Sequence, residues 1–215
     1  MINYNTVRAV LFDLDGVLVD TAIYHFQAWR RLAAELGYSF SIVDNEQLKG
    51  VSRVESLELI LNWAGLEKSE TEKAVLLTKK NQWYLELIEQ LSPEHLLAGS
   101  LDLLKKLREK GIRIALGSAS KNALGILEKT GIVDYFDALI DGNAVQLSKP
   151  NPEVFLKGAE VLGIEPACCL VLEDAQAGID AARAAGMQVI GVGQAEHLNG
   201  ADLVVPDLGT LVDKF

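Results

Sequence analysis

The stretch VRAVLFDLDGV, residues 7–17, decides the fold of this 215-residue chain. Its first half, Val7 to Phe12, is nearly continuous in apolar residues, which is typical of a central strand buried on both faces of a parallel sheet. Two carboxylates, Asp13 and Asp15, follow this strand directly, and Gly16 comes next. Taken alone, the two aspartates are as readily turn residues, because Asp and Gly favour such positions.

The rest of the sheet is predicted from about residue 96 onward. Short apolar strands are expected at residues 112–116, 138–140, 169–172 and 189–192, separated by amphipathic helices. These helices are stopped by glycines, of which Gly111 and Gly186 are examples. Strands alternating with helices predict right-handed crossovers and a parallel sheet with helices on both faces. The fold class is therefore expected to be α/β, with a Rossmann-like parallel sheet core.

A different region follows the first strand. Residues 20–92 are helical by pattern, with one helix from Thr21 to Leu36 and two that begin after Ser52 and Ser69. Each of these serines has a glutamate three residues later, as in a capping box. We expect an α/β core of residues 1–17 plus 96–215 and an inserted all-helical cap of residues 18–95. The two crossings between these parts are candidates for a hinge.

Composition and charge exclude several classes of protein. The chain has 30 acidic and 20 basic side chains, a net charge of −10, which argues against nucleic acid because binding its backbone needs a basic surface. The 49% apolar content argues against disorder. No apolar run approaches the ~18 residues that a bilayer requires, and the apolar segment 7–19 is broken by its two aspartates, unlike a signal peptide. We expect a cytoplasmic monomer without membrane or nucleic-acid partners.

Polar side chains follow four of the expected strands. Each has an ordinary explanation: the aspartates form turns, the serines cap helices, the lysine is solvated and the acidic pair favours the next helix start. However, ligands bind outside the carboxyl ends of the strands in open parallel sheets, so all of them should meet at one crevice. Coincidence then becomes the weaker explanation. The residues are Asp13 and Asp15, Ser118 to Ser120, Lys149, and Glu173 with Asp174.

Together these residue types fit phosphoryl transfer. The carboxylates offer the hard oxygen ligands that suit Mg²⁺. A carboxylate beside a metal, such as Asp13, can act as a nucleophile, and Asp15 can act as general acid and base. Lys149, the Ser118 hydroxyl and backbone amides at the next helix start would bind phosphoryl oxygens. Metal, nucleophile, acid/base and positive clamp are the parts that this reaction needs.

In order and spacing, these four groups make the chain resemble the haloacid dehalogenase superfamily of phosphotransferases, with the helical insertion where that superfamily places a cap. Asp13 to Val17 resembles its first motif and Ser118 its second, while Lys149 resembles the third and Glu173-Asp174 the fourth. Within the superfamily, the similarity narrows to the β-phosphoglucomutases. It rests on residues 21–29, 45–53, 118–122 and 172–178.

This resemblance implies an activity and a set of catalytic residues. Asp13 would take the phosphoryl group, and Asp15 would exchange protons with a sugar hydroxyl, while Ser118 and Lys149 would complete the catalytic set. Such enzymes interconvert β-D-glucose 1-phosphate and glucose 6-phosphate through a 1,6-bisphosphate. The resemblance also implies Mg²⁺ as cofactor, held by Asp13, the Asp15 carbonyl, Glu173 and Asp174.

Further residues would contact the sugar and the distal phosphate. Without the resemblance, Trp29 is most simply a core anchor and the lysines are solvated. Arg53 differs, because a cation in the first turn of a helix opposes the helix dipole, which indicates another duty such as gripping phosphate. The implied set is His25, Trp29, Lys49, Gly50, Arg53, Ser56, Lys80, Ala119, Lys121 and Asn122.

Two other functions stay open. A sugar-phosphate phosphatase would use the same parts, and a non-catalytic phospho-acceptor module would use Asp13 alone. The helical insertion and the position of Asp13 after the first strand disfavour the acceptor module. The net acidity does not exclude a phosphorylated sugar, because the carboxylates are assigned to a metal and five cations are expected at the cleft: Lys49, Arg53, Lys80, Lys121 and Lys149.

Overall fold

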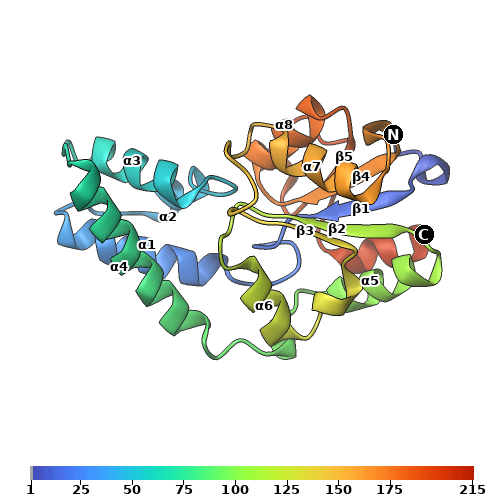
Figure 1. The fold of residues 1–215 in the computed structure, drawn as a ribbon, viewed down its shortest axis with the longest axis horizontal. Coiled ribbons are helices and arrows are strands. Elements are labelled where there is room, and N and C mark those ends of the chain that lie inside the picture. Colours follow the sequence, from blue (N-terminus) through green and yellow to red (C-terminus); the bar gives the residue numbers. More distant parts are fainter. Residues whose placement is uncertain (1) are drawn as a thin grey trace.

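Six parallel strands form the sheet of the computed structural model, which describes residues 2–215 (Figure 1). Their spatial order is β3-β2-β1-β4-β5-β6. The predicted α/β fold is confirmed. The strands are β1 (Ala9–Phe12), β2 (Arg113–Gly117), β3 (Ala138–Ile140), β4 (Cys169–Glu173), β5 (Gln188–Val192) and β6 (Leu203–Val205).

The first strand lies at the centre of this sheet. Every residue of β1 is buried, and Ala9 is in register with Arg113 of β2 on one side and Cys169 of β4 on the other. The carboxyl ends of these three strands therefore meet at one edge. Only β6 lacks a counterpart among the strands expected from the sequence: it is a partly exposed edge strand of three apolar residues.

Two apolar clusters cover the two faces of the sheet. Because alternate residues of a strand point to opposite faces, Phe12 lies in one cluster and Leu11 in the other. The first cluster includes α5 (Ser100–Glu109) and α6 (Ala123–Thr130), and the second includes α7 (Glu153–Leu162) and α8 (Gln176–Ala184). Pro152 is the N-cap residue of α7.

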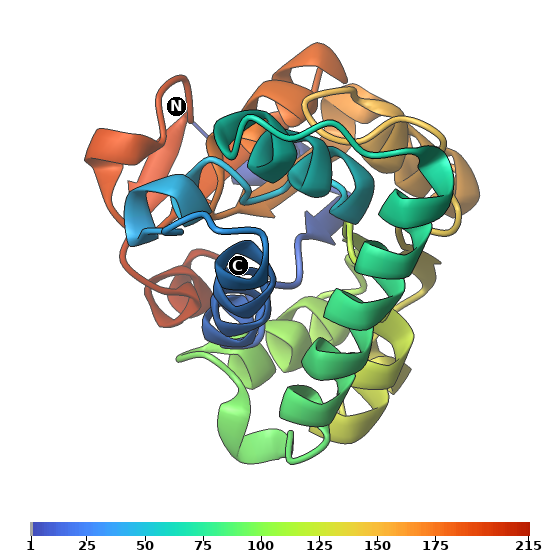
Figure 2. The same ribbon diagram turned by 90° about the vertical axis from the view of Figure 1, so that its left-hand side faces the viewer.

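Four helices form a separate layer beyond the edge where β1, β2 and β4 end (Figures 1 and 2). They are α1 (Ala22–Glu35), α2 (Ile42–Glu46), α3 (Arg53–Trp63) and α4 (Glu70–Ile88), and α1 packs along α4. The sequence pattern misses α2, because five residues are too few to show a helical period. The Ser69 capping box is complete, but at Ser52 the Glu55 carboxylate accepts from the hydroxyl rather than the backbone N–H. No helix within residues 2–215 combines the length and apolarity needed to cross a membrane.

The two chain crossings between the layers run side by side. Val19 forms an antiparallel bridge with Leu96, and the Leu97 N–H donates to the Leu18 carbonyl over 3.0 Å. The Ser100 hydroxyl donates to the same carbonyl over 3.1 Å. The division into a core of residues 1–17 plus 96–215 and a cap of residues 18–95 stays a prediction, and this paired crossing is where its hinge would lie.

Candidate active site

Three carboxylates gather at the ends of β1 and β4. Asp13 follows β1, Glu173 ends β4, and Asp174 comes next, and one oxygen from each lies within 4.8 Å of the others. The chain makes room for this by a glycine: Gly16 has a φ of +84°, and a Cβ there would collide with the Asp174 carboxylate. Three oxygens converging at this distance form a donor set that suits a hard divalent cation.

Lys149 is the counter-charge of this acidic cluster. Its Nζ lies 2.6 Å from Asp13 Oδ1 and 2.6 Å from Glu173 Oε1, and all three side chains are buried. Burial lowers the Lys149 pKa, but the two carboxylates outweigh burial and raise it. Lys149 lies in the loop between β3 and α7, and its peptide bond to Pro150 is cis.

The cluster still holds more negative charge than one lysine balances. Burial is the main reason that the pKa of Glu173 is raised to about 7 and that of Asp174 is raised well above its usual range. In both cases nearby carboxylates add to the effect. A divalent cation would remove this penalty, so the residues present fit a bound Mg²⁺.

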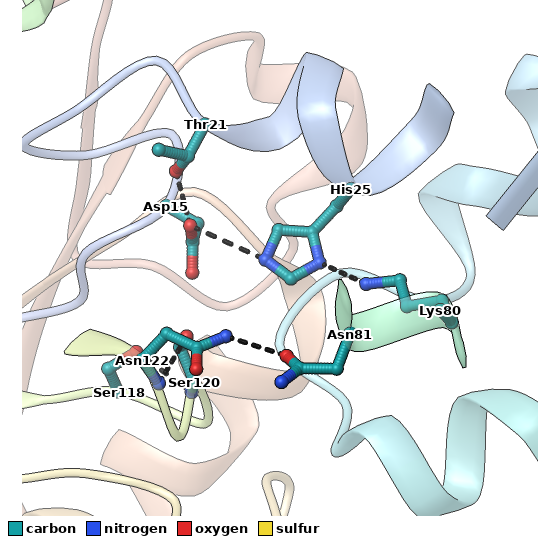
Figure 3. Close-up of polar contacts among 8 residues, drawn as sticks. All are labelled: Asp15, Thr21, His25, Lys80, Asn81, Ser118, Ser120 and Asn122. Atoms are coloured by element: carbon teal, nitrogen blue, oxygen red, sulfur yellow. Dashed lines mark hydrogen bonds and ion pairs between the residues drawn. The ribbon is translucent and has the colours of Figure 1, made fainter. Parts of the chain in front are cut away.

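Asp15 lies beside the cluster but points to the helical layer. Its carboxylate accepts a hydrogen bond from the Thr21 hydroxyl, and His25 Nε2 lies 3.7 Å from its Oδ1 (Figure 3). Burial, and then the neighbouring Asp13, raise the pKa of Asp15 to about 6. A carboxyl group that titrates this close to neutrality can both give and take a proton.

Lys80 forms the opposite wall, held among aromatic rings. Its Nζ lies 2.9 Å from His25 Nδ1, 4.6 Å from the centre of the Trp29 ring and 4.9 Å from that of Tyr84. The simpler alternative of a solvated lysine does not hold for Lys80, since only 1% of it is exposed and the rings replace water around its charge. Burial, and then the positive charge of Arg53, lower its pKa to about 7.

A cleft separates the two walls, and most of the predicted site residues line it. Lys49 reaches across it, with its Nζ 3.0 Å from Glu46 and 3.6 Å from Asp174. The predicted residues around the cleft are Asp13, Asp15, His25, Trp29, Lys49, Gly50, Arg53, Ser56, Lys80, Ala119, Lys121 and Asp174. Cations from the helical layer thus face carboxylates from the sheet.

Four predicted residues lie behind this lining. Glu173 and Lys149 are buried beneath Asp13 as described, and the Ser118 hydroxyl accepts from the Ser120 N–H over 3.1 Å. Ser118 and Lys149 also line an adjoining cavity that shares Arg53, Ala119 and Lys121 with the cleft. The Asn122 amide bonds to a residue of α4 instead of facing the cleft.

Sequence reasoning missed three residues that shape the site. Tyr84 packs on His25 with ring centres 4.1 Å apart, and its position four residues after Lys80 on one helix was a usable signal. Thr21 and Asn81 gave no such signal. Thr21 reads as an ordinary helix start, and Asn81 meets its partner Asn122 across 41 positions of sequence.

Comparisons with known proteins agree with this site. The haloacid dehalogenase-like hydrolase family matches residues 7–186. The β-phosphoglucomutase of Bacillus subtilis is 47% identical over 201 residues, which is 93% of this chain and 89% of that protein. The phosphorylated carbohydrates phosphatase of Thermotoga maritima is 31% identical, covering 86% of this chain and 84% of that protein.

A solved structure is also similar to this chain over nearly its whole length. The β-phosphoglucomutase of Clostridium difficile superposes with a TM-score of 0.92 at 43% identity, covering 95% of this chain and 93% of that one. The family match spans both the acidic cluster and the inserted helices. The chain therefore belongs to the haloacid dehalogenase-like hydrolase family.

Proposed function

We propose that this enzyme is a Mg²⁺-dependent β-phosphoglucomutase that interconverts β-D-glucose 1-phosphate and glucose 6-phosphate. One observation carries the proposal: a carboxylate cluster built on the sheet faces, across one cleft, a wall of cations and a histidine from the inserted helices. The similarity to two proteins named β-phosphoglucomutase supports it. The 1,6-bisphosphate through which the two sugar phosphates interconvert has one phosphate for each side of the cleft.

Asp13 is the group that carries phosphate between sugars. One of its carboxylate oxygens attacks a phosphorus atom of the 1,6-bisphosphate, forming an acyl phosphate as the bond from phosphorus to the sugar oxygen breaks. The reverse step passes the phosphoryl group to the other hydroxyl of a sugar monophosphate and frees the Asp13 carboxylate. The paired Lys149 Nζ, 2.6 Å from Asp13 Oδ1, holds that carboxylate in a fixed orientation.

Asp15 moves the proton in each half-reaction. When the sugar oxygen leaves phosphorus, protonated Asp15 gives it a proton, and when a hydroxyl attacks, ionised Asp15 takes one. A pKa of about 6 suits both directions. The Thr21 hydroxyl and His25 are placed to orient this carboxyl group.

Mg²⁺ would be held by the side chains of Asp13, Glu173 and Asp174, with the Asp15 backbone carbonyl as a further ligand. When bound, the ion neutralises charge on the phosphoryl group during transfer. The convergence of three carboxylate oxygens supports this assignment.

The helical wall binds the other phosphate and excludes water. Arg53 and Lys49 of the helical layer, with Lys121 of the loop between β2 and α6, line the cleft and supply positive charge for a distal phosphate. A predicted hinge at the paired crossing would let the bisphosphate leave, turn and return with its other end inward. Closure matters because a sugar hydroxyl held about 3 Å from phospho-Asp13 has a large effective concentration over water.

A sugar-phosphate phosphatase is the second candidate, favoured by the similarity to the phosphorylated carbohydrates phosphatase. The two are separated by incubating the enzyme with β-glucose 1-phosphate, Mg²⁺ and a trace of the bisphosphate, and following ³¹P signals. The mutase proposal predicts glucose 6-phosphate as the dominant product. Inorganic phosphate as the dominant product would overturn it.

A further inference from the structure

A single side-chain hydrogen bond connects helix α4 to the loop between β2 and α6. The Asn122 amide Nδ2 donates to Asn81 Oδ1 over 3.0 Å (Figure 3). Both residues are half-buried. Other polar contacts within residues 2–215 also join the helical layer to the sheet layer. They include the Lys49–Asp174 ion pair and the hydrogen bond from the Lys129 ammonium to the Glu89 carbonyl. The amide pair is a neutral contact between the layers, on a helix that also carries Lys80.

Asn122 ends a series of bonds that shape the loop. The Ser120 N–H donates to the Ser118 hydroxyl over 3.1 Å, and the Asn122 N–H donates to the Ser120 hydroxyl over 3.3 Å. Ser120 and Lys121 line the cleft. Hydrogen bonds within the loop therefore fix its backbone, whereas the side chain of Asn122 is oriented by Asn81 of the helical layer.

On α4, Asn81 immediately follows Lys80. Consecutive helical residues point about 100° apart, so the two side chains leave the helix in different directions: Lys80 toward His25 and Asn81 toward the loop. His25 in turn lies 3.7 Å from Asp15. One turn of α4 therefore touches both the acid/base side of the cleft and the loop at its other side.

We propose that Asn81 is a positioning residue that fixes the Asn122 amide and links the loop at residues 118–122 to helix α4. The Asn81 oxygen accepts one N–H of that amide, and this bond holds in place the end of the loop whose preceding residues, Ser120 and Lys121, line the cleft. Formation of this bond also holds α4 against the loop, and with it the Lys80–His25 pair beside Asp15. The inference rests on the proposed function, because it assigns the loop to the distal phosphate.

The test is a double-mutant cycle with Asn81→Ala, Asn122→Ala and the double variant. The first readout is the dissociation constant of glucose 6-phosphate in the presence of Mg²⁺, measured by calorimetry. Asn81→Ala should weaken binding roughly 3- to 10-fold, as expected for one hydrogen bond. Because both residues act through the same bond, adding Asn81→Ala to Asn122→Ala should change binding by less than about 2-fold.

The second readout is the ratio of glucose 6-phosphate formed to inorganic phosphate released. Asn81→Ala should lower this ratio, since a loosely held α4 admits water, while a merely structural role would leave it unchanged. Gln82→Ala is the matched control, because Gln82 is the next residue on α4 and is exposed. Asn81→Asp keeps an acceptor oxygen for Asn122, so it should hold the ratio near that of the unmodified enzyme even where the alanine variant folds poorly.

The inference is overturned if Asn81→Ala leaves both readouts unchanged, or if the losses of the two single variants multiply in the double variant. Binding of glucose 6-phosphate does not depend on isomerisation. An unmodified enzyme that releases only inorganic phosphate would therefore refute the proposed function while the binding cycle still decides the role of Asn81.

Discussion

The sheet side and the helical side of the cleft hold their charges in different ways. On the sheet side, Asp13, Glu173 and Lys149 are buried and locked by two ion pairs of 2.6 Å. On the helical side, Lys49 keeps 28% of its side chain exposed and is shared between Glu46 and Asp174. Apart from Lys80, the helical charges stay close to water.

This difference separates two tasks. Groups that stabilise a transition state work best when they are fixed before the reaction, because no energy is then spent on reorienting them. Groups that admit and release a charged substrate must exchange water for phosphate at every turnover. We expect substitutions on the sheet side to remove chemistry or stability, and those on the helical side to act more weakly.

The largest effect is expected for Asp15→Asn on the sheet side. Turnover should fall by about 10²–10⁴-fold, because the proton of the sugar hydroxyl has no acceptor. Phosphorylation of Asp13 by acetyl phosphate should persist, since the acetate that leaves needs no proton; intact-mass spectrometry measures it. Asp20→Asn is the control, because Asp20 is exposed. Turnover within 3-fold of the unmodified enzyme would refute the role of Asp15.

Lys149→Met should have the next largest effect, on stability. Removing one partner of a buried ion pair costs about 3–5 kcal/mol, because Asp13 and Glu173 are left unpaired. Urea unfolding without divalent cations measures this loss, and adding Mg²⁺ should recover part of it by neutralising the same carboxylates. Lys157→Met, at a lysine that keeps 38% of its side chain exposed, is the control, with an expected loss of about 0.5 kcal/mol. Equal losses for the two variants would contradict the buried network.

Lys80 tests the exception on the helical side. Its pKa falls from 10.5 to about 7 on burial, so between these values the unfolded chain binds more protons and stability rises with pH. The groups that face its charge are His25, Asp15 and Arg53. Lys80→Met should be more stable than the unmodified protein at pH 7, by about 1–4 kcal/mol. Denaturant midpoints should converge as the pH approaches 10, whereas a constant difference would contradict the lowered pKa.

The smallest effect is expected for Ser69→Ala, far from the cleft on the helical side. Losing the hydroxyl that caps α4 should cost about 1 kcal/mol of unfolding free energy, measured by thermal denaturation. Isomerisation should be unchanged, because α4 keeps its place through packing against α1. A lower isomerisation rate in fully folded Ser69→Ala protein would contradict the assignment of different tasks to the two sides of the cleft.

The same difference explains how much could be predicted from the sequence. The sheet side follows from local patterns: each of its polar groups ends an apolar strand or lies in the loop that follows one, and parallel strands end at one edge. Asp13, Lys149 and Glu173 are therefore predictable as neighbours, although 136 residues separate Asp13 from Lys149. Although these residues are far apart in sequence, the parallel sheet brings them to the same edge.

The helical side resists prediction because its contacts depend on how whole helices pack. Nothing near Lys80 in the sequence shows that Trp29, from another helix, will lie against it. The Asn81–Asn122 bond likewise joins two polar residues that each suit solvent. The five-residue α2 was missed for the simpler reason that it is too short to show a helical period.

The central claim is that the sheet side makes phospho-Asp13 and the helical side directs its phosphoryl group to a sugar. The direct measurement is a rapid-quench experiment: enzyme phosphorylated by acetyl phosphate is mixed with β-glucose 1-phosphate and Mg²⁺, and the fate of the phosphoryl group is counted. We predict that nearly all of it appears as glucose 1,6-bisphosphate and then glucose 6-phosphate. Release of most of it as inorganic phosphate at saturating sugar phosphate would contradict the account.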